Sequence, residues 1–162
     1  MMKDKKVLII RVILTVLTVA AIAAIFYNSS QDAVESTERS SPLTDWINGI
    51  LAGFPIPFSV TENFIRKLAH FTEYSILGAL LSVTYYLYFH RIKTALISTL
   101  ISGAVIATID EIIQLFPAGR SCQISDILLD CCGVAFATAI VMLIIRAIEN
   151  NRLKKQLNEQ SS

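Results

Sequence analysis

The chain has 162 residues, of which 54% are hydrophobic, and its formal net charge is only +1. Its mean hydropathy is positive, and it contains four long apolar stretches, so an ordinary soluble domain is excluded. No cluster of basic residues typical of nucleic-acid binding occurs, and we expect no nucleic-acid partner.

Each apolar stretch is about 20 residues or longer, enough to cross roughly 30 Å of hydrocarbon as an α-helix. We therefore predict an all-α integral membrane protein, a bundle of four transmembrane helices in one domain, residues 1–148. A polar cytoplasmic tail, residues 149–162, follows it, either as a short polar helix or as a disordered segment. The predicted helices are Val7 to Tyr27, Leu68 to Phe89, Thr94 to Phe116 and Ile124 to Ile148.

The first stretch resembles a signal peptide, because a basic start precedes a long apolar run that contains Ala21-Ile22-Ala23. The run continues to Tyr27, which is too long for the apolar region of a cleaved signal peptide. We expect a retained membrane anchor.

Basic residues flank one set of helix ends, and the excess of Lys and Arg on cytoplasmic loops predicts that both termini lie inside the cell. The segment between the first two helices, residues 28–66, then forms a long outer loop. The flanking residues are Lys3, Lys5, Lys6, Arg91, Lys93, Arg152, Lys154 and Lys155.

Within the outer loop, apolar residues between Leu43 and Phe58 recur at helical spacing. This pattern predicts a short helix at the membrane interface with Trp46 as an aromatic anchor. An ordinary packed loop helix is the alternative.

Ionisable residues within the apolar stretches are the strongest functional signal, because charged groups are costly in hydrocarbon. The predicted topology places all of them at one level, in the outer leaflet. They are Arg66, Lys67, His70 and Glu73 on the second helix, Asp110 and Glu111 on the third, and Asp126 and Asp130 on the fourth.

Helical spacing groups these residues into stripes that we expect to face the bundle interior, because small residues on the same stripes permit close helix contact. One stripe comprises Gly103, Ala107, Asp110 and Gln114, and another comprises Asp126, Asp130, Gly133 and Ala137. On the second helix, Arg66, His70 and Glu73 share one stripe, and Lys67, Phe71, Tyr74 and Gly78 share the next, so this helix can contact two neighbours. Arg120, in the link between the last two helices, is placed to reach Glu111, Gln114 or Asp126.

The three cysteines form no disulfide or metal-binding pattern. We interpret Cys131 and Cys132 as small buried hydrophobic residues. Cys122 is expected to be exposed in the loop before the last helix.

Four segments together resemble the VanZ family of bacterial membrane proteins, in the family's order. They are Phe26 to Gln31, Arg66 to Tyr74, Asp110 to Arg120, and Ser125 to Gly133. One difference is Asp130, where the family pattern Asn-x-x-Gly has Asn. The resemblance implies a membrane protein of the bacterial cytoplasmic membrane, and the family's founding member is associated with low-level resistance to the lipoglycopeptide teicoplanin. It names no substrate, and most members have no assigned reaction.

Three interpretations of the polar cluster remain open. The residues can form a purely structural network, in which His70 bonds a carboxylate across the bundle. They can bind an anionic or zwitterionic head group of a membrane lipid, a lipoglycopeptide or a lipid-linked envelope precursor. They can also form a metal or acid/base catalytic site that modifies such a head group, so enzyme activity stays open. The expected binding residues are Gln31, Arg66, Lys67, His70, Tyr74, Asp110, Glu111, Gln114, Arg120 and Asp126, and the catalytic candidates are His70, Glu73, Asp110 and Glu111.

Five carboxylates face at most four basic groups, so full ionisation would leave unbalanced negative charge in a medium that penalises it. Either a proton is retained or a cation is bound. We favour a shared proton and no metal or other cofactor, because desolvation and like-charge repulsion both favour protonation of a carboxyl group and no recognisable ligand spacing such as His-Glu-x-x-His occurs.

Overall fold

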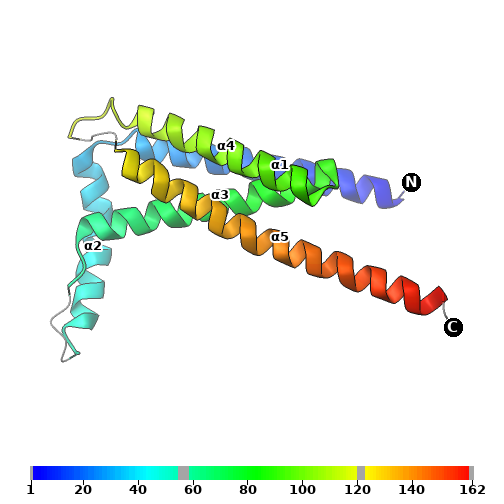
Figure 1. Cartoon of the computed structure of the whole chain (residues 1–162). Helices are drawn as coiled ribbons and strands as arrows, with labels where there is room; N and C mark the ends of the chain where they lie inside the picture. Colours follow the sequence, from blue (N-terminus) through cyan, green and yellow to red (C-terminus); the bar gives the residue numbers. More distant parts are fainter. Residues whose placement is uncertain (1, 55–58, 120–122, 161–162) are drawn as a thin grey trace.

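The computed structural model describes residues 2–54, 59–119 and 123–160, and all regular structure in these ranges is α-helical. Five helices follow one another, and four of them run along a common bundle axis while α2 lies across one end (Figure 1). Both termini lie at the other end. The helices are α1 (Met2–Ser29), α2 (Ala33–Leu51), α3 (Glu62–Phe89), α4 (Ile92–Ile113) and α5 (Ile124–Gln160).

The all-α prediction is confirmed, and α1, α4 and α5 are long and apolar enough to cross a membrane. The fourth predicted span, Leu68 to Phe89, falls in α3, which is long enough but does not share this apolar composition. Polar side chains recur along α3, and this helix contacts each of the other four. Because its neighbours cover much of it, α3 tolerates polar residues that lipid contact would penalise.

Close packing of α3 against α5 depends on glycine. A Cβ atom added to Gly78 would lie 2.7 Å from the carbonyl oxygen of Val134, and one added to Gly133 would lie 2.6 Å from the carbonyl oxygen of Phe71. Gly103 of α4 also faces Val134. These contacts confirm that the predicted small-residue stripes face the bundle interior.

The polar segment before Leu43 is helical, which corrects the prediction of a helix from Leu43 to Phe58. Asp32 caps α2 by accepting a hydrogen bond from the backbone N–H of Glu35 at 2.9 Å, and the helix continues through Pro42. The apolar pattern behind the prediction begins at Leu43, in the second half of α2. The end of the predicted helix, residues 55–58, lies outside the described residues.

The end of α3 is held by α1. The guanidinium group of Arg11 donates a hydrogen bond to the carbonyl oxygen of Leu87 at 2.7 Å and lies 3.0 Å from Nε2 of His90. His90 ends α3 in the left-handed conformation, with φ of 53°. Arg11 therefore satisfies a carbonyl group that the helix end leaves without an intrahelical partner.

α5 continues without a break to Gln160, so the predicted polar tail is helical over its described residues, 149–160. Every residue from 151 to 160 is exposed. Figure 1 shows these last turns projecting beyond the other helices.

One cysteine prediction is wrong. Cys131 is half-buried and packs against the hydrophobic core, as predicted, but Cys132 is exposed. Adjacent positions on a helix point in different directions, so only one of the two can face the core. Cys122 lies outside the described residues.

Candidate functional site

The predicted polar residues gather at the end of the bundle that carries α2. Three carboxylic side chains there are almost completely buried: Asp110 is 0% exposed, Glu111 is 1% exposed and Asp130 is 1% exposed. Asp110 and Glu111 lie on the last turn of α4, and Asp130 lies on the second turn of α5. Packing of α4 against α5 therefore brings acidic groups together from separate parts of the sequence.

Two of these carboxylates have protein hydrogen-bond donors. The side-chain amide of Gln114 donates to Oδ2 of Asp110 at 3.3 Å and to the hydroxyl oxygen of Ser29 at 3.4 Å. The backbone N–H of Gln123 donates to Oε2 of Glu111 at 2.9 Å. Glu111 thus helps to fix the start of α5 relative to the end of α4.

Asp130 differs from its neighbours, because neither of its carboxylate oxygens has a hydrogen-bond partner among the described residues. Oδ1 of Asp130 lies 3.9 Å from Nδ1 of His70, on α3. Tyr74, one turn after His70, is fully buried and close enough to Asp110 and Asp130 to interact electrostatically with both. Asp130 is therefore a buried acid whose nearest described basic group is an imidazole.

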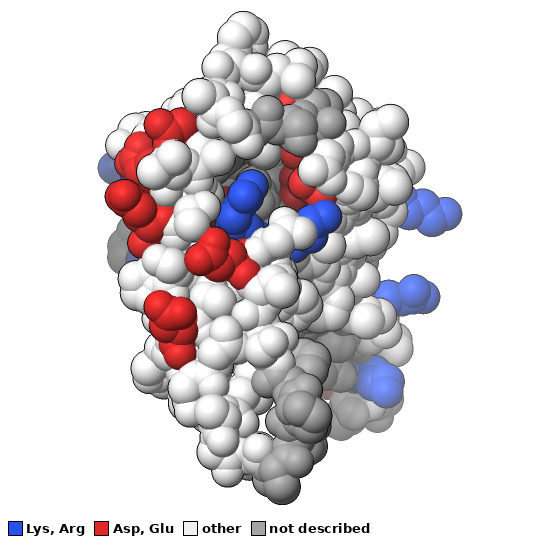
Figure 2. Space-filling view, turned by 90° about the vertical axis from the view of Figure 1, so that its left-hand side faces the viewer, with Lys and Arg blue, Asp and Glu red and all other residues white. Residues whose placement is uncertain are grey.

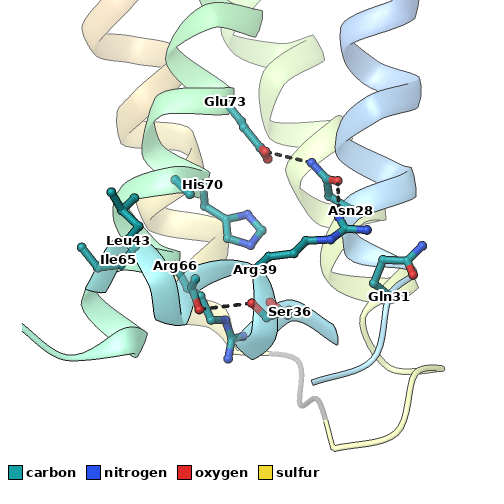
Figure 3. Close-up of a pocket in the computed structure, with 11 residues that line it drawn as sticks. Asn28, Gln31, Ser36, Arg39, Leu43, Ile65, Arg66, His70 and Glu73 are labelled. Atoms are coloured by element: carbon teal, nitrogen blue, oxygen red, sulfur yellow. Dashed lines mark hydrogen bonds between the residues drawn. The ribbon is translucent and has the colours of Figure 1, made fainter. Parts of the chain in front are cut away.

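A cavity of about 240 Å³ opens beside this cluster, between α2, α3 and the end of α1. Figure 3 shows the side chains of His70 and Arg39 directed toward the side that carries Asn28, with Glu73 above them, whereas the Arg66 side chain extends toward the bottom of the view. From the end that carries α2, the surface is hollowed near its centre, and basic side chains lie in and beside the hollow (Figure 2). The cavity is lined by Asn28, Gln31, Ser36, Arg39, Ser40, Leu43, Ile65, Arg66, Ala69, His70 and Glu73.

Asn28 organises the inner wall of the cavity. Its amide group donates a hydrogen bond to Oε1 of Glu73 at 2.9 Å, and its side-chain oxygen accepts one from Arg39 at 3.3 Å. Arg39 also donates to Oε1 of Glu35 at 2.8 Å. The side-chain amide of Asn28 thus lies between Glu73 and Arg39 and forms a hydrogen bond with each of them.

Arg66 is less constrained than Arg39. Its Nε atom is buried and has no hydrogen-bond partner among the described residues. A buried donor of this kind costs free energy unless something accepts from it. Arg66 is therefore a cationic side chain of the cavity lining with one donor that no described residue satisfies.

Lys67 faces a different neighbour from Arg66, as the two stripes on this helix predict. Its Nζ atom donates to Oδ1 of Asp126 on α5 at 2.8 Å. This pair is partly exposed and separate from the cavity lining.

The structure thus divides the predicted site residues into three groups. Gln31, Arg66, His70 and Glu73 line the cavity; Tyr74, Asp110, Glu111, Gln114 and Asp130 form the buried cluster; and Lys67 and Asp126 pair with each other. His70 joins the first two groups. Arg120, predicted to reach Glu111, Gln114 or Asp126, lies outside the described residues.

Prediction from sequence missed three polar residues of this region. Asn28 and Ser29 lie in the segment Phe26 to Gln31 that carries part of the family resemblance, so a signal for them was present. Arg39 lies outside the predicted helices, in the first half of α2. A cap at Asp32 with Glu35 three residues later is a helix-start pattern that would have indicated it.

Three apolar helices and a polar cluster buried at one end of the bundle define an α-helical membrane protein. The family profile described as VanZ/LLP1 matches residues 14–146, most of the chain. The chain therefore belongs to the VanZ/LLP1 family. Neither a curated protein nor a solved structure matches it.

Proposed function

We propose that this protein binds the phosphate-bearing head group of a membrane amphiphile in the cavity formed by Arg39, Arg66 and His70. The observation that carries the proposal is Arg66, which lines the cavity and whose buried Nε atom has no hydrogen-bond partner among the described residues. Arginine presents several donors in a planar fork that suits phosphate oxygens. An anionic head group would satisfy this donor and balance its charge.

The surroundings of the cavity support a ligand that approaches from the membrane. Apolar Leu43 and Ile65 line the same cavity as the basic groups. Trp46 of α2 is 64% exposed, and α2 lies across the bundle end (Figure 1), as expected for a helix at the interface. A lipid can therefore place its head group among the polar residues and its chains along apolar surface.

The size of the cavity limits what can enter it. A volume of about 240 Å³ lies below the roughly 300 to 1,000 Å³ of pockets that enclose drug-sized ligands. A head group fits, whereas a whole glycopeptide does not. Any effect on teicoplanin tolerance would then follow from binding a lipid, a lipid-linked envelope precursor or the acyl end of the drug.

The proposed setting is the bacterial cytoplasmic membrane, with four spans, both termini inside and the cavity in the outer leaflet. The α2 end and the two termini lie at opposite ends of the bundle (Figure 1). That arrangement is compatible with α3 as the fourth span and with both termini on one side of the membrane, and the basic residues that flank the terminal end favour the cytoplasm for that side.

Lipid retention tests the proposal directly. Purified protein, exposed to bilayers containing phosphatidylglycerol and an uncharged glycolipid, should retain phosphatidylglycerol preferentially in native mass spectrometry. Replacement of Arg66 by Gln should remove most of that preference, because only the charged donor is lost. Arg146→Gln, at an exposed position of α5, is the matched control and should behave like the parent protein. Equal retention by the parent protein and Arg66→Gln would refute the proposal.

A teicoplanin assay tests the link to resistance separately. Cells that express the parent protein, Arg66→Gln or Arg146→Gln are compared for teicoplanin tolerance at equal membrane abundance. Tolerance that is lost only with Arg66→Gln supports head-group binding as its cause. Unchanged tolerance in all three strains would separate lipid binding from drug resistance.

The second candidate is an enzyme that modifies a lipid-linked head group. The observation that favours it is the position of His70, which lines the cavity and also faces the Asp130 carboxylate. A histidine beside a carboxylate is a common general base. Mass spectrometry of phospholipids incubated with the protein would show a product that His70→Gln does not form, whereas unaltered lipids would leave binding as the function.

A further inference from the structure

We propose that His70, Asp110 and Asp130 form a binding site for one divalent transition-metal ion, such as Zn²⁺ or Mn²⁺. The three residues come from α3, α4 and α5, so the site exists only in the assembled bundle. One ligand atom from each lies within 4.8 Å of the others.

The buried carboxylate of Asp130 needs a group that compensates its charge. Its side chain is 1% exposed, and both of its oxygens lack a hydrogen-bond partner among the described residues. Asp110 adds a second buried carboxylate, which has polar neighbours in Gln114, Ser29 and Tyr74. A carboxylate that is removed from water must be compensated by a proton, a donor or a cation.

The spacing of these side chains suits a metal ion better than a shared proton. A shared proton requires two oxygen atoms at hydrogen-bond distance, roughly 2.5 to 3.0 Å. Asp130 makes no such contact with any described residue. A metal ion bridges wider gaps: with bonds of about 2.1 Å, its ligand atoms lie roughly 3 to 4 Å apart. The distances between the three ligand atoms need to shorten by only about 1 Å to reach that spacing. Small changes in the side-chain rotamers can produce this shift.

The three side chains are also of the types that bind divalent transition metals. Two carboxylates and a neutral imidazole suit a divalent ion such as Zn²⁺ or Mn²⁺. Two negative charges balance the charge of the ion, so the buried cluster becomes nearly neutral. Gln114 already holds the second oxygen of Asp110 at 3.3 Å, which orients that ligand.

Sequence spacing contained no sign of this site. Metal motifs such as His-Glu-x-x-His place two ligands on one helix, whereas here each helix supplies one ligand. The prediction of a shared proton depended on that missing spacing and on the cost of burying like charges, a cost that a bound cation also relieves. The bundle nevertheless brings one possible ligand atom from each of three helices to within 4.8 Å of the others.

Elemental analysis tests the site. The full-length protein is purified with a tag that binds no metal, stripped with a chelator, incubated with Zn²⁺ or Mn²⁺ and freed of excess ion. The parent protein should retain about one ion per chain, as a single three-ligand site requires. Retention far below one ion per chain with both metals would overturn the proposal.

Variants assign the ion to these residues. Asp110→Asn and Asp130→Asn should weaken binding by more than the roughly 10- to 100-fold that loss of a supporting hydrogen bond costs. Asp126→Asn is the matched control, because it makes the same change one turn earlier on α5 in a residue that pairs with Lys67. Equal metal content in Asp126→Asn and Asp130→Asn would place the ion elsewhere and refute the assignment.

A measurement on the parent protein alone covers the case in which Asp130→Asn fails to accumulate. Ligands that bind only the folded state raise the unfolding temperature. Zn²⁺ or Mn²⁺ at micromolar concentration should raise it, while Ca²⁺, which prefers six or more oxygen ligands, should not. No shift with either transition metal would refute the site. Head-group retention does not depend on this result, so the two proposals can fail separately.

Discussion

Nζ of Lys67 lies 2.8 Å from Oδ1 of Asp126 and links α3 to α5 by an ion pair at the edge of the site. Both side chains are more than a quarter exposed, so water screens much of their attraction. Lys67→Gln should therefore lower the free energy of unfolding by less than about 1 kcal/mol. Thermal unfolding in detergent measures this, and a loss of several kcal/mol would show that the pair is more deeply buried in the membrane protein than its exposure indicates.

The contact between α3 and α5 predicts a large effect for a very small side chain. Gly78→Ala places a Cβ atom 2.7 Å from the backbone of Val134, and backbone cannot move aside cheaply. We expect a loss of roughly 1 to 3 kcal/mol in the free energy of unfolding. The matched control is Gly49→Ala in α2, where an added Cβ atom meets nothing within 4 Å.

At Gly49, alanine should be neutral or stabilising by up to about 1 kcal/mol, because it restricts the unfolded chain. Thermal unfolding of the two variants side by side provides the comparison. Equal stability of Gly78→Ala and Gly49→Ala would contradict the close helix contact.

Asn28 is expected to be essential for the cavity, although it carries no charge. In Asn28→Asp, the group that donates to Glu73 becomes a second carboxylate, while the shape is preserved. Repulsion should displace the Glu73 side chain, and the new charge should attract Arg39 away from a bound anion. We expect weaker retention of phosphatidylglycerol in the native mass-spectrometry assay.

Asn151→Asp, at an exposed position near the end of α5, controls for the added charge and should leave retention unchanged. Retention that falls equally in both variants would point to a general charge effect. Retention unchanged in Asn28→Asp would show that Asn28 does not organise the cavity.

Topology is tested by thiol labelling in a background where the three native cysteines are replaced by serine. Glu38→Cys, on an exposed position of α2, should react with an impermeant reagent in intact cells. Gln156→Cys, exposed near the end of α5, should react only after the cells are opened. The reverse pattern would place the cavity on the cytoplasmic side.

The positions of most helices could be predicted because apolar periodicity and length are local properties. α1, α4 and α5 coincide with predicted stretches to within a few residues at their starts. α2 was located only in its apolar half, because residues 33–42 are polar and their helical state depends on the cap at Asp32. For the end of α5, the sequence left a polar helix and a disordered tail open, since a polar sequence without a break signal is compatible with both.

Contacts between helices at the site could not be predicted from patterns within single helices. Topology and helical stripes correctly grouped His70, Asp110 and Asp130 at one end, because each stripe is set by the spacing within one helix. Which carboxylate receives a donor is decided between helices: Glu111 is bonded by Gln123, and Asp130 by no described residue. Likewise, the pairing of Lys67 with Asp126 could not be read from either helix alone.

The unbroken course of α5 offers a practical route to an experimental structure. Its 37 residues correspond to roughly 55 Å of helix, against about 30 Å of hydrocarbon. A folded marker protein joined to Gln160 by a continuous helix would share the orientation of the bundle instead of tumbling on a tether. Such a fusion would give electron microscopy a fixed landmark outside the detergent micelle.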